Sequence, residues 1–232
     1  MRLPWPRPIE APLSAAEIDE LLRETFGSVL GDRAFEQINR RSWVRSRKTP
    51  IREAVGIASL KGYSFMPGWS ISLDFVPHVT TSGRIAWHRT AEQHRADLGV
   101  DPLDDPERLP ADRLMIRGMG RRDAVHRGLK RSAAIAVDLA EAWFSRISDV
   151  ASLIPLFEEA ERQCNERFGF DNYVQHRLAF AFVLARTGDL DRARAELDRW
   201  CERHISVGFE LEASRRSSLR GELHALLDAA VE

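Results

Sequence analysis

The clearest hydrophobic pattern in the first hundred residues is an alternation with a period of two, which starts at Trp69. Large apolar side chains occupy every second position, and the positions between them are mostly small or polar. The apolar positions are Trp69, Ile71, Leu73 and Phe75, and the alternate positions are Ser70, Ser72, Asp74 and Val76. A half-buried strand produces this alternation. We predict a β-hairpin with strands over 69–78 and 85–90.

The register of this hairpin decides which side chains meet. A three-residue connection over 81–83 keeps the apolar residues of both strands on one face, and such a loop favours glycine at its end, where Gly83 stands. The predicted pairs are Val79 with Ile85, His78 with Ala86, Val76 with His88 and Asp74 with Thr90. His78 and His88 then become diagonal neighbours on the polar face, together with Asp74 and Arg84.

Three weaker patterns precede the hairpin. Ser14 and Glu17 have the spacing of a capping box, which predicts a helix that ends at Gly27. The segment 33–47 is ambiguous between helix and strand, although Arg41-Ser-Trp-Val-Arg45 favours a strand. The run 51–60 predicts a further strand.

The second half of the chain has helical periodicity. A loop over 99–112, rich in proline and aspartate, separates it from the β-rich half. The next helix is predicted from an apolar stripe of Val125, Leu129, Ala133, Ala136, Ala140 and Trp143. Another is predicted from Leu153 to Cys164, closed by Gly169, and a last one from Ser217 to Val231.

Residues 174–205 resemble a single tetratricopeptide unit. The positions that carry the resemblance are Ala181, Leu184, Gly188, Leu190, Ala193 and Leu197. Trp200 and Ile205 depart from the pattern, where that repeat has alanine and proline. Because a repeat array needs about three copies and one is evident, we predict a helical hairpin packed on the domain.

The order of elements also resembles uncharacterised bacterial domains of unknown function that have a short antiparallel sheet followed by a helical tail. The segments that carry this resemblance are 41–45, 73–78, 87–90 and 178–197. It implies an α+β fold and no particular chemistry. We predict an antiparallel sheet of three to four strands followed by packed α-helices.

The predicted boundaries follow composition. Four prolines within residues 1–13 predict an extended arm, and 14–232 is expected to form one α+β domain, β-rich over 14–110 and helical over 111–232. With 44% hydrophobic residues, 30% charged residues and a net charge of −1, the chain has no global field to attract nucleic acid or membrane. Cys164 and Cys201 have no metal or redox spacing. We expect a cytoplasmic protein without cofactor, metal or membrane partner.

Three functional hypotheses remain open. The first is a protein-interaction or regulatory module without catalytic activity, whose sheet face or helical hairpin binds another protein. The second is a hydrolase or nuclease with His78, His88, Asp74 and Arg89 as catalytic residues. The third is a nucleic-acid binder through basic residues. The candidate binding residues are Arg84, Arg117, Arg121, Arg122 and Lys130.

Overall fold

The computed structural model describes residues 12–48, 50–103, 109–162, 173–208 and 211–231. Its strands are β1 (Glu36–Asn39), β2 (Ser42–Lys48), β3 (Ile51–Leu60), β4 (Ser64–Leu73), β5 (Pro77–Val79), β6 (Ile85–Trp87), β7 (Leu98–Val100) and β8 (Ile116–Arg117). Its α-helices are α1 (Ala15–Gly31), α2 (Ala111–Leu114), α3 (Arg122–Phe144), α4 (Leu153–Arg162), α5 (Val174–Arg186), α6 (Leu190–Trp200) and α7 (Ala213–Asp228). A π-helix, η2 (Cys201–Gly208), continues α6, and a short 3₁₀ turn, η3 (Ala229–Val231), follows α7.

The main sheet is antiparallel and larger than predicted. Within the described residues it has six strands, in the order β1-β2-β3-β4-β7, and β8 pairs with the other end of β4. This confirms an α+β architecture but corrects the expected three to four strands. The prediction missed β7 and β8 because three-residue and two-residue strands are too short to show a period. Pro67 lies on β4 between the stretches that pair with β7 and β8. Neither strand pairs with this position, so proline, which has no N–H group to donate, is tolerated there.

The predicted hairpin forms, but its first strand is interrupted. The chain turns after Leu73, and β5 and β6 form a separate two-stranded sheet. Within it the predicted pairs of His78 with Ala86 and Val79 with Ile85 are present, and Gly83 has a φ of +73°. The predicted partners of Asp74 and Val76 were wrong. Their amides are used elsewhere, by the carbonyls of Pro50 and Leu73, so the ladder does not extend to them.

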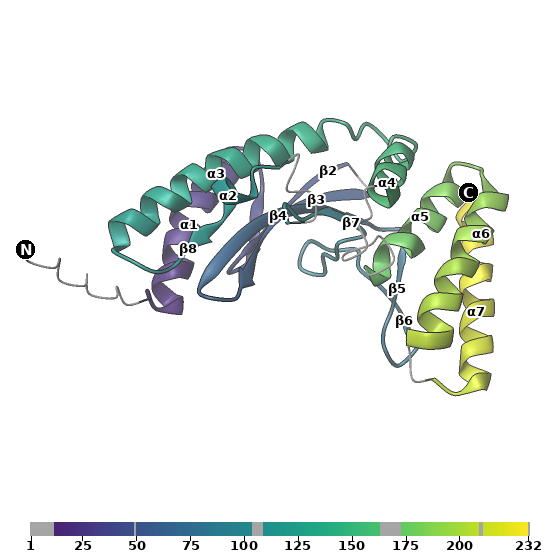
Figure 1. Cartoon of the computed structure of the whole chain (residues 1–232). Helices are drawn as coiled ribbons and strands as arrows, with labels where there is room; N and C mark the ends of the chain where they lie inside the picture. The colour runs from purple at the N-terminus through teal and green to yellow at the C-terminus, as the bar shows by residue number, and fades with distance from the viewer. Residues whose placement is uncertain (1–11, 49, 104–108, 163–172, 209–210, 232) are drawn as a thin grey trace, which may run out of the picture.

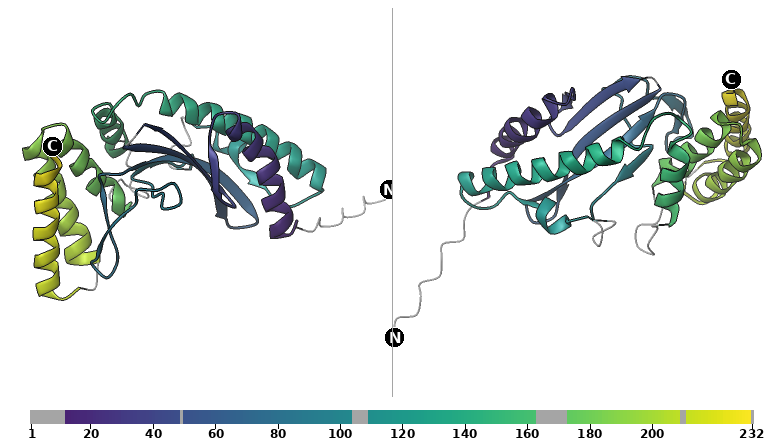
Figure 2. Two further views of the ribbon diagram at one scale, coloured as in Figure 1. Left: turned by 180° about the vertical axis from the view of Figure 1, so that it is seen from behind. Right: turned by 90° about the horizontal axis from the view of Figure 1, so that it is seen from above.

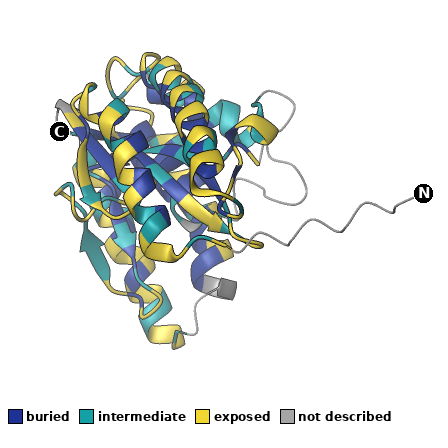
Figure 3. Cartoon of the chain, turned by 90° about the vertical axis from the view of Figure 1, so that its left-hand side faces the viewer, coloured by how far each residue is buried: buried dark blue, intermediate teal, exposed yellow. Residues whose placement is uncertain are grey.

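Helices α1 and α3 lie side by side on one face of the main sheet (Figures 1 and 2). Both halves of the predicted capping box are present at Ser14 and Glu17. The helix continues past Gly27 to Gly31, contrary to the prediction, because Leu30 extends the buried stripe by one turn. Apolar residues of both helices face the sheet, and exposed residues cover their outer side (Figure 3).

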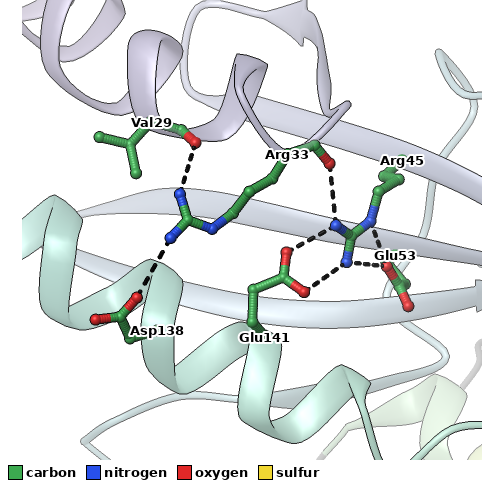
Figure 4. A network of polar contacts seen from close by, with 6 residues as sticks. All are labelled: Val29, Arg33, Arg45, Glu53, Asp138 and Glu141. Atoms are coloured by element: carbon green, nitrogen blue, oxygen red, sulfur yellow. Dashed lines mark hydrogen bonds and ion pairs between the residues drawn. The ribbon is translucent and has the colours of Figure 1, made fainter.

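An ion-pair network ties this sheet to its helices (Figure 4). Arg45 on β2 donates to Glu53 on β3 at 2.7 Å, to both carboxylate oxygens of Glu141 on α3 at 2.7 and 3.0 Å, and to the carbonyl of Arg33 at 3.0 Å. Arg33 donates in turn to Val29 and Asp138. The side chains of Arg45 and Glu53 therefore point toward α3, and residues one position away on each strand point to the opposite face.

The helical part follows in the chain, with α5 at its centre (Figure 1). Residues 178–185 of α5 are all buried, so this helix has little amphipathic pattern. Gly188, with a φ of +91°, makes the turn into α6. Of the two residues that depart from the tetratricopeptide pattern, Trp200 ends α6 and Ile205 lies in the π-helix η2. The last helix begins at Ala213, earlier than predicted.

Some predictions fall outside the described residues. These are most of the arm over 1–13, Cys164 and Gly169. Of the arm, Pro12 forms a β-bridge with Met119, and the amide of Leu13 donates to the carbonyl of Gly118 at 3.1 Å.

Candidate functional site

The two imidazoles singled out in the sequence come together. The ring centroids of His78 on β5 and His88, just after β6, are 5.0 Å apart, and the rings meet edge to face at 72°. This contact depends on the β5–β6 register that Gly83 closes. Both residues are half-buried.

A glutamine from the helical part fixes one ring. The side-chain amide of Gln175 on α5 donates through Nε2 to the carbonyl of Pro77 at 2.9 Å. That bond orients the amide, so Oε1 accepts from Nδ1 of His78 at 3.1 Å. Neutral His78 therefore carries its proton on Nδ1 and its lone pair on Nε2. No pattern in the sequence marked Gln175, because α5 is buried on all sides.

Asp74 has a different partner from the one expected. It pairs with Arg52 of β3, and the same guanidinium donates to the carbonyl oxygen of His88 and to the hydroxyl of Ser72 at 3.3 Å. Arg52 is buried, and it was missed as a site residue. The β3–β4 register, which places Arg52 opposite Ser72, could not be read from the sequence.

Two more ionisable residues reach the cluster from the segment before β7. His94 contacts the hydroxyl of Ser70 through Nε2 at 3.1 Å, and burial, with Arg52 and Arg95 nearby, lowers its pKa to about 4. Asp97 accepts from the amide of Leu73 at 2.5 Å, and burial raises its pKa to about 7. Neither residue lies in a periodic segment, so hydrophobic patterning gave no indication of either.

His88 is the least satisfied member of the cluster. Both ring nitrogens are shielded from solvent, and within the described residues their one polar neighbour is the backbone of Gln93, which lies outside good hydrogen-bond geometry. Burial lowers its pKa, and positive charge on His78 or Arg95 lowers it further. We call His78, His88 and His94 the imidazole cluster.

The geometry gives limited support to catalysis. Ser70 and His94 lie at a nucleophile-to-base distance, but an imidazolium at His94 would stand close to Arg52 and Arg95, so His94 is a weak base. Arg89 is exposed, stacks on Trp87 at 4.6 Å and donates to the carbonyl of Asp74 at 3.3 Å. No group of three or more metal-ligating side chains occurs within the described residues.

A pocket of about 380 Å³ lies beside the cluster on the sheet face opposite α1 and α3. We call it the outer groove. Small residues of four strands contribute to its lining, and further residues come from the start of α5 and from the segment after β7. The strand residues include Ser42, Gly56, Ala58, Gly68, Ser70 and Gly99, and the others include Asp101, Tyr173 and His176. Ser70 therefore belongs both to the groove and, through His94, to the imidazole cluster.

The candidate basic residues do not form one surface. Arg117, Arg121, Arg122 and Lys130 are exposed on β8 and the first half of α3, whereas Arg84 is exposed on the β5–β6 hairpin at the other end of the molecule (Figure 1). Arg122 pairs with Glu20 of α1 at 2.9 Å, and Arg121 pairs with Asp123 at 3.7 Å. These carboxylates partly neutralise the patch.

Comparisons of the chain with protein-family models, with curated proteins and with solved structures gave no significant match. Among the helices that the structure describes, none combines the length and the apolar composition that a membrane crossing requires.

Proposed function

We propose that the protein is a binding module that holds an extended segment of another protein in the outer groove. The observation that carries this proposal is a row of three small residues in the groove, whose lining also includes Met66, Pro67 and Trp69. Ser42, Gly56 and Gly68 are direct neighbours across β2, β3 and β4, so they form a row perpendicular to the strands. A second chain can approach the sheet closely over Ser42 and Gly56, because neither residue carries a bulky side chain. At Gly68 the carbonyl of Val100 lies 3.0 Å from the place of an added Cβ, so this residue closes one end of the row.

The residues around this row suit a peptide ligand. Tyr173 is half-buried and adds an aromatic ring to the lining, where it stacks on the buried ring of His176 with centroids 4.6 Å apart. Burial lowers the pKa of His176 to about 4, so its imidazole is neutral at pH 7. Asp101 then supplies a negative charge to the lining. We expect the bound segment to place a small or flat residue over Gly56 and a lysine or arginine near Asp101.

A filling substitution tests the groove. A Cβ atom at Gly56 would approach only Ser42 and the carbonyl of Arg41, at 3.8 and 3.9 Å, so a leucine there enters the groove without straining the sheet. Gly221 is the matched control, since it is exposed on α7 and its added Cβ would meet nothing within 4 Å.

The probe is a displayed library of linear peptides, selected on the full chain, with the affinity of enriched peptides measured by fluorescence anisotropy. Gly56→Leu should weaken binding at least tenfold, equivalent to about 1.4 kcal/mol. Gly221→Leu should leave the affinity within twofold of the unsubstituted protein. Equal binding to both variants, or failure to enrich any peptide, would contradict the proposal.

A further inference from the structure

The β5–β6 hairpin is held by the helical part at two points. At its base, Gln175 of α5 bonds to Pro77 and His78, and a third contact of the same amide reaches the carboxylate of Asp97. At its tip, Arg215 of α7 donates to the carbonyl of Gly83 at 2.5 Å. The hairpin therefore joins the end of the main sheet to α5 and α7.

The base of the hairpin is a poor environment for added positive charge. The cationic groups that face the imidazole cluster are Arg52 from β3 and Arg95 from the segment before β7. A proton on His88 would be repelled by both guanidinium groups, and the ring of His78 lies 5.0 Å away, centroid to centroid. In a partly buried site such repulsion is weakly screened.

The acidic groups that face the cluster are already engaged. Asp74 pairs with Arg52, and its carbonyl accepts from Arg89. Asp97 is buried and accepts from the amide of Leu73 and from Gln175. Gln175, the polar group that α5 contributes, is neutral. A proton taken up by His88 or His94 therefore gains little compensation while the hairpin stays closed.

We propose that the imidazole cluster is a proton-operated latch, which holds the hairpin against α5 while His88 and His94 are neutral and releases it when these two rings take up protons. The released hairpin hydrates His78 and His88, and it frees the segment that carries His94. The opening also removes the hydrogen bonds that Gln175 makes to Pro77 and His78. This inference is independent of what occupies the outer groove.

The direction of the pH response follows from the rings. Burial lowers the pKa of His88 below its usual range and that of His94 to about 4, so release takes up protons as the pH falls from about 6.5 toward 4. Exposure of Asp97 would have the opposite effect on proton uptake, because its raised pKa would fall and the carboxyl would release a proton. Its bond to the Leu73 amide, within the sheet, keeps it buried during a local opening.

Hydrogen exchange of the full chain tests the latch, with intrinsic rates corrected for pH. Between pH 7.5 and 5.0, the protection of segment 75–90 should fall at least tenfold, while that of α3 stays unchanged. His88→Phe keeps a ring of similar shape and removes the titrating group, and His94→Gln keeps a polar side chain that can bond to Ser70. The double variant H88F/H94Q should lose most of the pH response.

His224→Gln is the matched control, because His224 is a half-buried histidine on α7 that pairs with Asp198, away from the hairpin. It should respond to pH as the unsubstituted protein does. The proposal is overturned if the unsubstituted protein shows no local loss of protection, or if α3 loses protection together with the hairpin. It is also overturned if the folded double variant keeps the full response.

Discussion

Gln175 accepts a hydrogen bond from His78 at 3.1 Å, although the two residues are 97 positions apart in the chain. This contact, with the bond from Gln175 to Pro77, fixes the hairpin against the first turn of α5. It makes the candidate site a junction between the β-rich and helical halves of the chain. Four predictions follow from this junction and from the core around it.

Gln175→Ala should destabilise the protein by about 1–3 kcal/mol, because partly buried donors and acceptors on the hairpin would lose their partner. Urea unfolding measures the change in the free energy of unfolding. Gln37→Ala is a suitable comparison, since Gln37 is exposed and makes a single 3.3 Å bond to the carbonyl of Arg40. Equal effects of the two substitutions would argue against a structural role for the Gln175 contacts.

Asp97 should make stability fall as the pH rises. Its pKa in the folded protein is about 7, above the value of 3.8 expected for the unfolded chain. The folded state then holds an extra proton between these values, so the contribution is fully present below pH 3.8 and is lost by about pH 7. Urea unfolding at pH 4.5 and pH 8 measures it. The stability of the unsubstituted protein relative to Asp97→Asn should decline across this range, and a rise would show that the carboxyl is stabilised in its ionised form.

Arg45→Met should cost about 3–5 kcal/mol, since it removes the guanidinium that pairs with the buried carboxylate of Glu53 and with Glu141. Arg33→Met, which removes a pair with the exposed Asp138, should cost less than about 1 kcal/mol. Chemical denaturation measures the free energy of unfolding of each variant. Similar losses in the two variants would contradict a network that depends mainly on Arg45.

Gly83→Ala should destabilise the hairpin by about 1–2 kcal/mol through its positive φ alone. The added Cβ would also come within 3.0 Å of Leu211, which must move. Gly31→Ala has open space around its Cβ and should be neutral or slightly stabilising at the end of α1. Thermal unfolding compares the two variants. A neutral Gly83→Ala would mean that the turn and the tip contact do not constrain the hairpin.

The sequence predicted local features that depend on neighbouring residues. The capping box at Ser14 and the turn at Gly83 were correct because each depends on a few adjacent positions. The meeting of His78 and His88 followed from that turn. Arg52, His94, Asp97 and Gln175 were not predicted, because segments distant in sequence bring them together and none lies on a face that periodicity reveals. Burial also raises the pKa of Asp97 to about 7, which no local sequence pattern indicates.

The additional strands of the main sheet and the buried helix α5 were likewise not marked by any periodic pattern in the sequence. β7 and β8 exist only because β4 offers them an edge, and neither has a pattern of its own. Residues 178–185 are buried on every side, so α5 lacked the amphipathic signal that predicted the α3 stripe from Val125 to Ala140. The last member of that stripe was wrong, because α3 buries Phe144 in place of Trp143. The resemblances to tetratricopeptide units and to bacterial domains of unknown function stay predictions.

The most direct test of the outer groove is a titration of the ¹⁵N-labelled protein with a peptide selected on it, followed through glycine amide resonances. Binding in the outer groove should shift the resonances of Gly56, Gly68 and Gly99 in proportion to occupancy, while those of Gly128 on α3 and Gly221 on α7 stay in place. Shifts confined to Gly128, Gly221 or their helices, with the three sheet glycines unmoved, would contradict the proposed binding site.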